Sequence, residues 1–146
     1  ERPILANIFY AIRLKPINEI EIEKLEKAFT LWLNTTWGLL IALVSGEITE
    51  GEFASLKISQ WKLTHVLNIH RLNRDTIEKL ASIFDKVSTQ SPRRITDQFS
   101  PEKIDPVRLE IDKGFLKAIE PSLTDQEINR YLRELYERVN IVLERL

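Results

Sequence analysis

The sequence predicts an α+β fold that is mostly helical, with a few short strands in its N-terminal half and a helical pair at its C-terminal end. Residues 6–14 are rich in β-branched and aromatic side chains and are followed by a Lys-Pro pair, which is typical of a strand. Several later stretches repeat apolar residues every three or four positions, as amphipathic helices do. A proline-containing polar stretch separates the last two of these helices from the rest and indicates a linker.

Two helices are expected after the first strand. From Glu19 onward the apolar residues recur at helical spacing, with charged residues on the other face. Residues 34–36 (Asn-Thr-Thr) favour helix N-caps and predict a break, followed by a second helix through Val44. This second helix is apolar on nearly all sides, so we expect it inside the core, with Gly46 capping its C-terminus.

The next segment predicts a turn, a second strand and a long helix. Residues 47–53 are expected to form a polar turn around the glycine at position 51, and Ser59 is a candidate cap for one helical turn. Apolar and polar residues alternate over 63–69, which predicts a strand. Residues 73–87 predict an amphipathic helix with a capping box that starts at Asp75.

The C-terminal part predicts two further helices. Asp105 followed by proline is a strong helix start, and that helix is expected to end near Ile119, before a proline. A capping box at 124–127 opens the last helix. We therefore divide the chain into a recognition or scaffold segment (1–88), a linker (89–104) and a C-terminal helical element (105–146).

The last helix carries apolar residues in a heptad pattern, which favours packing against another helix. The partner helix can belong to the same chain, or to another chain or domain through a coiled-coil contact. The seam residues are Ile128, Leu132, Leu135, Val139, Val142 and Leu146.

Composition narrows the possible functions. The 21 basic and 22 acidic residues give a net charge of -1, whereas a free-standing nucleic-acid binder usually has a basic excess. The absence of cysteine excludes disulfides and thiolate chemistry and fits a cytoplasmic setting. No signal peptide is evident, and the longest apolar run is far shorter than the roughly 20 residues that span a bilayer. The chain contains no methionine, so we expect it to be a segment of a longer protein.

No catalytic centre is evident in the sequence. The only histidines, His65 and His70, are five residues apart, which does not match a metal-binding spacing, and we expect both to be structural. No phosphate-binding or dinucleotide-binding glycine motif is present. Tryptophans could stack on bases, but Trp32 and Trp37 lie in the most apolar part of the chain and favour core packing, whereas Trp61 lies among polar residues.

The order of several motifs resembles the C-terminal region of adenine-specific DNA methyltransferases of restriction–modification type. The motifs lie at 7–10 (Asn-Ile-Phe-Tyr), 31–40 (Leu-Trp-Leu-Asn-Thr-Thr-Trp-Gly-Leu-Leu), 49–53 (Thr-Glu-Gly-Glu-Phe), 56–57, 66–68 and 105–112 (Asp-Pro-Val-Arg-Leu-Glu-Ile-Asp). A related layout closes the target-recognition domains of type I specificity subunits. The sequence departs from the pattern at Thr35, where serine is commoner, and at Glu47, where some relatives carry a basic residue nearby.

The resemblance implies a non-catalytic role in DNA recognition. In such enzymes the S-adenosylmethionine site and the Asn-Pro-Pro-aromatic motif lie upstream, and this chain contains no Asn-Pro-Pro. The chain is therefore expected to bind no cofactor, to adjoin an upstream catalytic domain, and to reach DNA as part of the parent protein. The alternative is a helical protein–protein interaction module that joins subunits, including by self-association. The candidate DNA contacts are Thr49, Gly51, Lys57, Gln60 and Lys62, together with Arg93 and Arg94 from the predicted linker.

Overall fold

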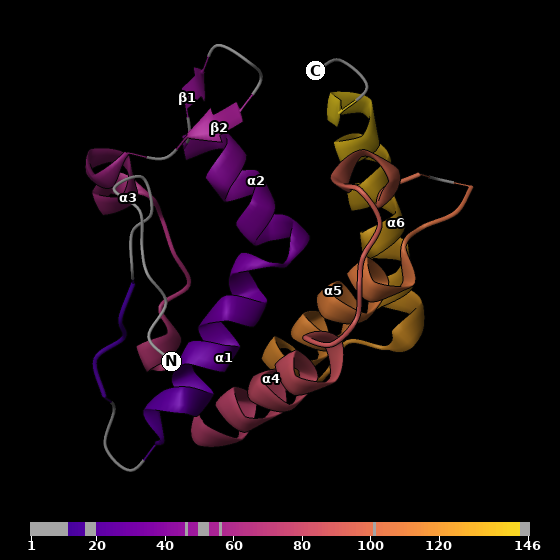
Figure 1. The fold of residues 1–146 in the computed structure, drawn as a ribbon. Coiled ribbons are helices and arrows are strands. Elements are labelled where there is room, and N and C mark those ends of the chain that lie inside the picture. The colour runs from indigo at the N-terminus through magenta and orange to yellow at the C-terminus, as the bar shows by residue number, and fades with distance from the viewer. Residues whose placement is uncertain are drawn as a thin grey trace.

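The fold is a helical assembly, shown as a ribbon in Figure 1. The computed structural model describes residues 12–16, 20–45, 47–49, 53–55, 57–100 and 102–143. The α-helices are α1 (Ile22–Leu33), α2 (Thr36–Ser45), α3 (Ile58–Leu63), α4 (Arg74–Val87), α5 (Pro106–Ile119) and α6 (Asp125–Leu143). Two 3₁₀ turns, η1 (Ile69–Arg71) and η2 (Ile95–Asp97), and two strands, β1 (Glu47–Thr49) and β2 (Phe53–Ser55), complete the described elements.

The predicted α+β class is wrong, because the described residues are mainly helical and their two strands form only a short two-stranded hairpin. The predicted strand over 63–69 instead contains the end of α3, an extended connection and the start of η1. Most of the predicted strand over 6–14 lies outside the described residues, and its described end at 12–14 is not paired in a sheet. The strands that the structure does describe, β1 and β2, form a short antiparallel hairpin between α2 and α3, with Thr49 opposite Phe53.

The main core lies between α1, α4 and α5. This core forms because the apolar residues of each helix recur three and four positions apart and therefore share one face. Figure 1 shows α4 and α5 packed beside α1. Residues on both sides of the expected linker therefore belong to one cluster. Its buried members include Leu25, Ala28 and Leu31 of α1, Ile77 and Leu80 of α4, and Ile111, Phe115 and Ala118 of α5.

A second apolar cluster packs around α6. Phe99, from the connection between α4 and α5, lies against Tyr136 with ring centroids 5.6 Å apart. Ile128, Leu132 and Val139 of α6 are buried in the same cluster, and side chains of α2 and α5 cover it in part. The second cluster thus joins the C-terminal helix to α2.

The break between α1 and α2 is a tight, capped junction, as the sequence predicts. The Thr35 hydroxyl donates to the Trp32 carbonyl at 2.6 Å and accepts from the Gly38 N–H at 3.1 Å. A side chain at Gly38 would collide with α1, because an added Cβ would lie 2.4 Å from the Trp32 carbonyl oxygen. Because glycine has no Cβ, α2 can start directly at the end of α1.

The prediction that α2 lies inside the core is wrong. Only Thr36 and Gly38, in its first turn, are buried, while Val44 near its end is 85% exposed. An all-round apolar sequence does not reveal whether enough neighbouring surface exists to cover the helix. Figure 1 shows that α2 extends beyond the packed helices α1, α4 and α5. The apolar side chains of Leu43 and Val44 near its end are exposed. Gly46, the expected C-cap, lies outside the described residues.

The later helices begin at residues that cap their N-termini. Asp105 accepts a hydrogen bond from the Arg108 N–H at 2.9 Å, and Glu127 accepts one from the Thr124 N–H at 2.8 Å, so both predicted starts are confirmed. The cap of α4 is Asn73, whose side chain accepts from the Thr76 N–H, rather than the predicted box at Asp75. The α3 cap is Lys57 rather than Ser59.

No single helix among the described residues is long and apolar enough to cross a membrane. The pair α1 and α2 reaches the required length and composition only when taken together, and the two helices meet at a bend of 72°.

Candidate functional site

A buried polar cluster is centred on Asp112 of α5. Its carboxylate accepts from the Thr36 backbone N–H at 2.7 Å, from the Thr36 hydroxyl at 2.5 Å and from the Tyr136 hydroxyl at 2.8 Å. Asp112 is fully buried. A carboxylate at the first N–H group of a helix is favourable, because that end of the helix carries partial positive charge. Asp112 therefore joins α5 to the start of α2 and to the middle of α6.

A buried arginine extends this cluster toward the α4–α5 connection. The Nε and Nη2 atoms of Arg108 donate to the Gln98 side-chain oxygen at 3.0 and 2.9 Å, and Nη1 donates to the Asn34 carbonyl. The guanidinium also lies over the Phe99 ring, 5.5 Å from its centroid. Asp105 closes the arrangement by accepting from the Arg93 N–H at 3.0 Å. We call Asn34, Thr36, Gln98, Asp105, Arg108, Asp112 and Tyr136 the polar hub.

The electrostatics of the hub are those of a structural network. Burial raises the pKa of Asp112, although three hydrogen bonds and the Arg108 charge act in the opposite direction. Burial and the neighbouring Asp112 carboxylate raise the pKa of Tyr136, so this phenol remains protonated and donates. No buried side-chain polar atom among the described residues lacks a partner. Because each hub group is already satisfied within the protein, the hub has no open position for a substrate.

An apolar groove opens beside the hub, between α2 and α6. Its cavity volume is about 170 Å³, and one wall is formed by the partly exposed side chains of α2. The hub residue Thr36 lines the groove, as does Phe99, whose ring lies under the Arg108 guanidinium. The groove can accept an apolar side chain or helix face, but it presents almost no polar group for chemistry. Its lining residues are Thr36, Leu39, Leu40, Ala42, Leu43, Ile95, Phe99, Val139 and Leu143.

The structure separates the predicted DNA contacts into two groups. Lys57 and Lys62 are exposed at the two ends of α3, and the Gln60 side chain accepts from the Lys57 N–H at 2.6 Å. Thr49 is the last residue of β1, and Gly51 lies outside the described residues. In Figure 1, α3 lies at the edge of the molecule opposite α6.

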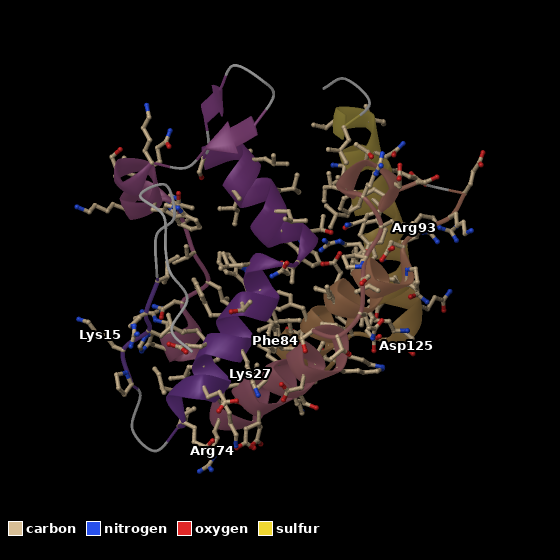
Figure 2. All side chains as sticks on the ribbon, viewed as in Figure 1. Lys15, Lys27, Arg74, Phe84, Arg93 and Asp125 are labelled. Atoms are coloured by element: carbon tan, nitrogen blue, oxygen red, sulfur yellow. The ribbon has the colours of Figure 1, made fainter. Side chains whose placement is uncertain are left out.

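Arg93 and Arg94 lie far from α3. Figure 2 shows Arg93 beside α6, across the molecule from Lys15. The Arg93 guanidinium donates to the Lys103 carbonyl at 2.8 Å and lies 3.9 Å from the Asp105 carboxylate. Arg93 thus holds the α4–α5 connection in place, whereas Arg94 is exposed. The two groups of basic residues cannot form one continuous contact surface.

The histidines and tryptophans differ in how far they are buried. His65 and His70 are exposed and lie on either side of the buried Ile69. Trp32 is buried against Phe29, with ring centroids 5.4 Å apart, so the expectation of core packing is confirmed for it. Trp37 is partly buried against Phe115 and Trp61 is partly exposed.

The heptad seam of α6 packs mostly within the chain. Ile128, Leu132 and Val139 are buried, Leu135 is partly buried, and Val142 is 51% exposed. Leu146 lies outside the described residues. Since the buried positions face α5, Phe99 and α2, they are not available to a second chain. Among the described seam positions, Val142 is the one that is exposed.

The hub residues Asp112, Tyr136 and Gln98 were missed as a group. A signal for Asp112 was present, because it lies four residues after Arg108 and next to Ile111 on the face of α5 that carries Phe115. A charged residue on the apolar face of a helix predicts a buried partner. Tyr136 follows the seam residue Leu135 and lies outside the predicted heptad positions, so the heptad pattern predicted neither its burial nor its contact with Asp112.

Among the described residues, no group of histidines and carboxylates could hold a metal ion. Comparison of the chain with protein-family models, with curated proteins and with solved structures finds no match.

Proposed function

We propose that this chain is a non-catalytic DNA-recognition and scaffold segment of an adenine-specific DNA methyltransferase of restriction–modification type. The observation that carries the proposal is the connection between the two longest motifs of the resemblance. Thr36, from the motif at 31–40, is hydrogen-bonded to Asp112, from the motif at 105–112. Asn34 and Arg108 connect the same two motifs a second time.

These contacts give the motif residues a physical role that fits a scaffold. A buried, fully paired network fixes the relative positions of α2, α5 and α6, and such a network is costly to disturb. Residues that bound a cofactor or a flipped base would instead need to face an open pocket. In this proposal, S-adenosylmethionine binding and methyl transfer belong to an upstream catalytic domain of the parent protein. The segment described here holds surface loops and α3 in fixed positions beside the DNA.

The test is a titration of the 146-residue chain with a short DNA duplex and, separately, with S-adenosylmethionine. We expect weak duplex binding, with a dissociation constant of about 10⁻⁴ to 10⁻⁶ M, that weakens steeply between about 50 and 200 mM salt. We expect no binding of S-adenosylmethionine. Absence of duplex binding at the lower salt concentration, or tight binding of the methyl donor, contradicts the proposal.

A hub variant provides the matched control for this titration. Tyr136→Phe removes one buried hydrogen bond and should lower stability, yet it should leave duplex affinity unchanged under conditions where the variant is folded. A loss of duplex affinity in the folded variant would mean that the hub acts in recognition and not as a scaffold.

The second candidate function is self-association, and the α2–α6 groove favours it. Val44 and Val142 are exposed near the groove, and apolar surface of this kind often marks a protein interface. Sedimentation velocity tests it with Val44→Glu and Val142→Glu, because these side chains are exposed and their replacement leaves the core intact. A concentration-dependent dimer that either change abolishes supports self-association, and a monomer at high concentration excludes it.

A further inference from the structure

The charges of this protein are distributed unevenly along the chain. From Phe53 to Arg74 no aspartate or glutamate occurs, while Lys57, Lys62, Arg71 and Arg74 contribute four positive charges. Since the whole chain carries a net charge of -1, the remaining residues together carry -5. The near-zero net charge therefore conceals a basic segment in an otherwise acidic protein, and the overall charge gives no argument against local binding of an anion.

The structure places this segment on the surface. Lys62, Arg71 and Arg74 are exposed, as are His65 and His70 between them. Among the described residues, neither Lys62 nor Arg71 forms an ion pair, whereas Arg74 lies 3.2 Å from the Glu78 carboxylate. Two cations with no carboxylate partner and a third with an intrahelical one leave a locally positive surface.

The basic residues follow one edge of the molecule. Figure 1 shows α3 and the connection that leads to α4 along the edge that is remote from α5 and α6. Figure 2 shows Lys15 pointing outward from this same edge, and Arg74 pointing outward at the start of α4. The extended residues 64–68, between α3 and η1, span at most about 16–18 Å. We call Lys62, His65, His70, Arg71 and Arg74 the basic edge.

A stretch of this length matches several phosphates of a nucleic acid. Duplex DNA carries one negative charge per roughly 1.7 Å of its axis, so a surface of up to about 16 Å passes up to about ten phosphate charges. The other basic patch fits less well, since Arg93 is engaged with Asp105 and the surrounding depression is also lined by Asp97 and Glu102. The two patches thus differ at their central cations, since Lys62 and Arg71 have no carboxylate partner among the described residues, whereas Arg93 lies beside Asp105.

We propose that the basic edge binds the phosphate backbone of duplex DNA, with Lys62 and Arg71 as the principal contacts. This inference rests on the proposed function, which supplies DNA as the polyanion, and it replaces the predicted contacts at Arg93 and Arg94. The contacts orient the protein on the duplex and carry no sequence information, because phosphates are the same at every base pair.

The experiment compares Lys62→Glu/Arg71→Glu with Arg133→Glu/Arg138→Glu in duplex titrations of the full chain. Both double variants change the net charge equally, and the control residues are exposed on α6, across the molecule from α3 (Figure 1). We expect the basic-edge variant to lose at least tenfold in affinity at low salt. Its slope of log K against log salt should become shallower by about two, since each phosphate contact contributes about 0.9. The α6 variant should lose much less affinity and retain the wild-type slope.

A second measurement does not depend on any variant. Amide chemical shifts of the wild-type chain, recorded during addition of the duplex, should change at residues 57–74 and remain constant on α6. Duplex binding with equal losses in both double variants, or with shifts centred on Arg93 and Arg94, overturns the basic edge and leaves the proposed DNA function standing. Equal displacement of the duplex by polyglutamate of matched charge would identify an acidic protein as the partner instead. Absence of any duplex binding contradicts the proposed function and the basic edge together.

Discussion

The Asp112 carboxylate accepts hydrogen bonds from both the backbone N–H and the hydroxyl of Thr36, the first residue of α2. The two residues are 76 positions apart in the sequence, so this contact fixes a distant helix start without a local cap on that N–H group. Tyr136 adds a third donor from α6. One buried carboxylate thereby determines how three helices meet.

Replacement of Asp112 by alanine should destabilise the fold strongly. The Thr36 N–H and the hydroxyls of Thr36 and Tyr136 would lose their acceptor in a buried site, and each unpaired buried group costs about 1–3 kcal/mol. Allowing for some rearrangement of the hydroxyls, we expect a loss of about 3–5 kcal/mol in the free energy of unfolding, measured by urea titration. Tyr136→Phe should cost only about 1 kcal/mol. Equal losses in the two variants would show that Asp112 does not organise the hub.

Replacement of Arg108 by lysine should also destabilise the protein, although the charge is kept. Arg108 donates through three nitrogens to Gln98 and Asn34 and lies over Phe99, and an ammonium group cannot reproduce this planar geometry. We expect a loss of about 1–3 kcal/mol in thermal or urea unfolding. Arg138→Lys on the exposed face of α6 is the control and should change stability by less than about 0.5 kcal/mol. An equally small effect at Arg108 would contradict the assigned geometry.

The free energy of unfolding should decrease at acid pH, because the Asp105 carboxylate becomes protonated. Burial acts to raise the pKa of this carboxyl, but hydrogen bonds from the N–H groups of Arg93, Arg108 and Val107 outweigh it and hold the pKa below its ordinary value of 3.8. A depressed pKa in the folded state contributes stability that is present above the unfolded pKa and is lost as the pH falls through the folded pKa. The loss of stability should therefore set in near pH 3.8 and continue below it.

The variant Asp105→Asn tests this linkage. Asparagine is also a good N-cap, so α5 should still form, while the acid-dependent part of the stability should become smaller. Chemical unfolding at several pH values measures the difference between wild type and variant. Asp97→Asn, an exposed position in the same connection, should retain the acid dependence. An unchanged pH profile in Asp105→Asn would show that other groups cause the acid loss.

The sequence predicted the helices well where apolar spacing and caps agreed. The starts at Asp105 and Thr124 and the break before Thr36 carry their own local signals, because a cap and its acceptor are at most three or four residues apart. The strand predicted over 63–69 was wrong. A short alternation of apolar and polar residues also occurs in an extended connection that pairs with no other strand. Alternation alone does not show that a second strand exists.

The candidate site was predicted less well than the fold. Lys62 and Arg93 were both predicted as DNA contacts, and only the three-dimensional fold shows that they lie on opposite sides of the molecule. The bond between Thr36 and Asp112 could not be deduced, since contacts 76 residues apart depend on the packing of α5 against α1 and α4. The α2 helix shows the same limit, because its exposure depends on which neighbours reach it.

The two described helical glycines should respond very differently to alanine. At Gly38 an added Cβ would lie 2.4 Å from the Trp32 carbonyl oxygen and 2.7 Å from that of Leu33, and these backbone atoms cannot move without shifting the α1–α2 junction. At Gly114 the nearest atom is the terminal methyl of Ile83, at 3.0 Å, which a rotamer change can relieve. Both substitutions gain about 1 kcal/mol of intrinsic helix propensity, so that gain cancels from the comparison.

We therefore expect Gly38→Ala to lower the free energy of unfolding by at least about 2 kcal/mol, and Gly114→Ala to change it by less than about 1 kcal/mol. Urea unfolding measures both values. Because Gly38 lies two residues after Thr36, displacement of the junction should also strain the bonds to Asp112. The double variant Gly38→Ala/Asp112→Ala should consequently lose less stability than the two single changes added together. Strict additivity would show that the junction and the hub act independently, and that the junction positions α2 through its own backbone contacts alone.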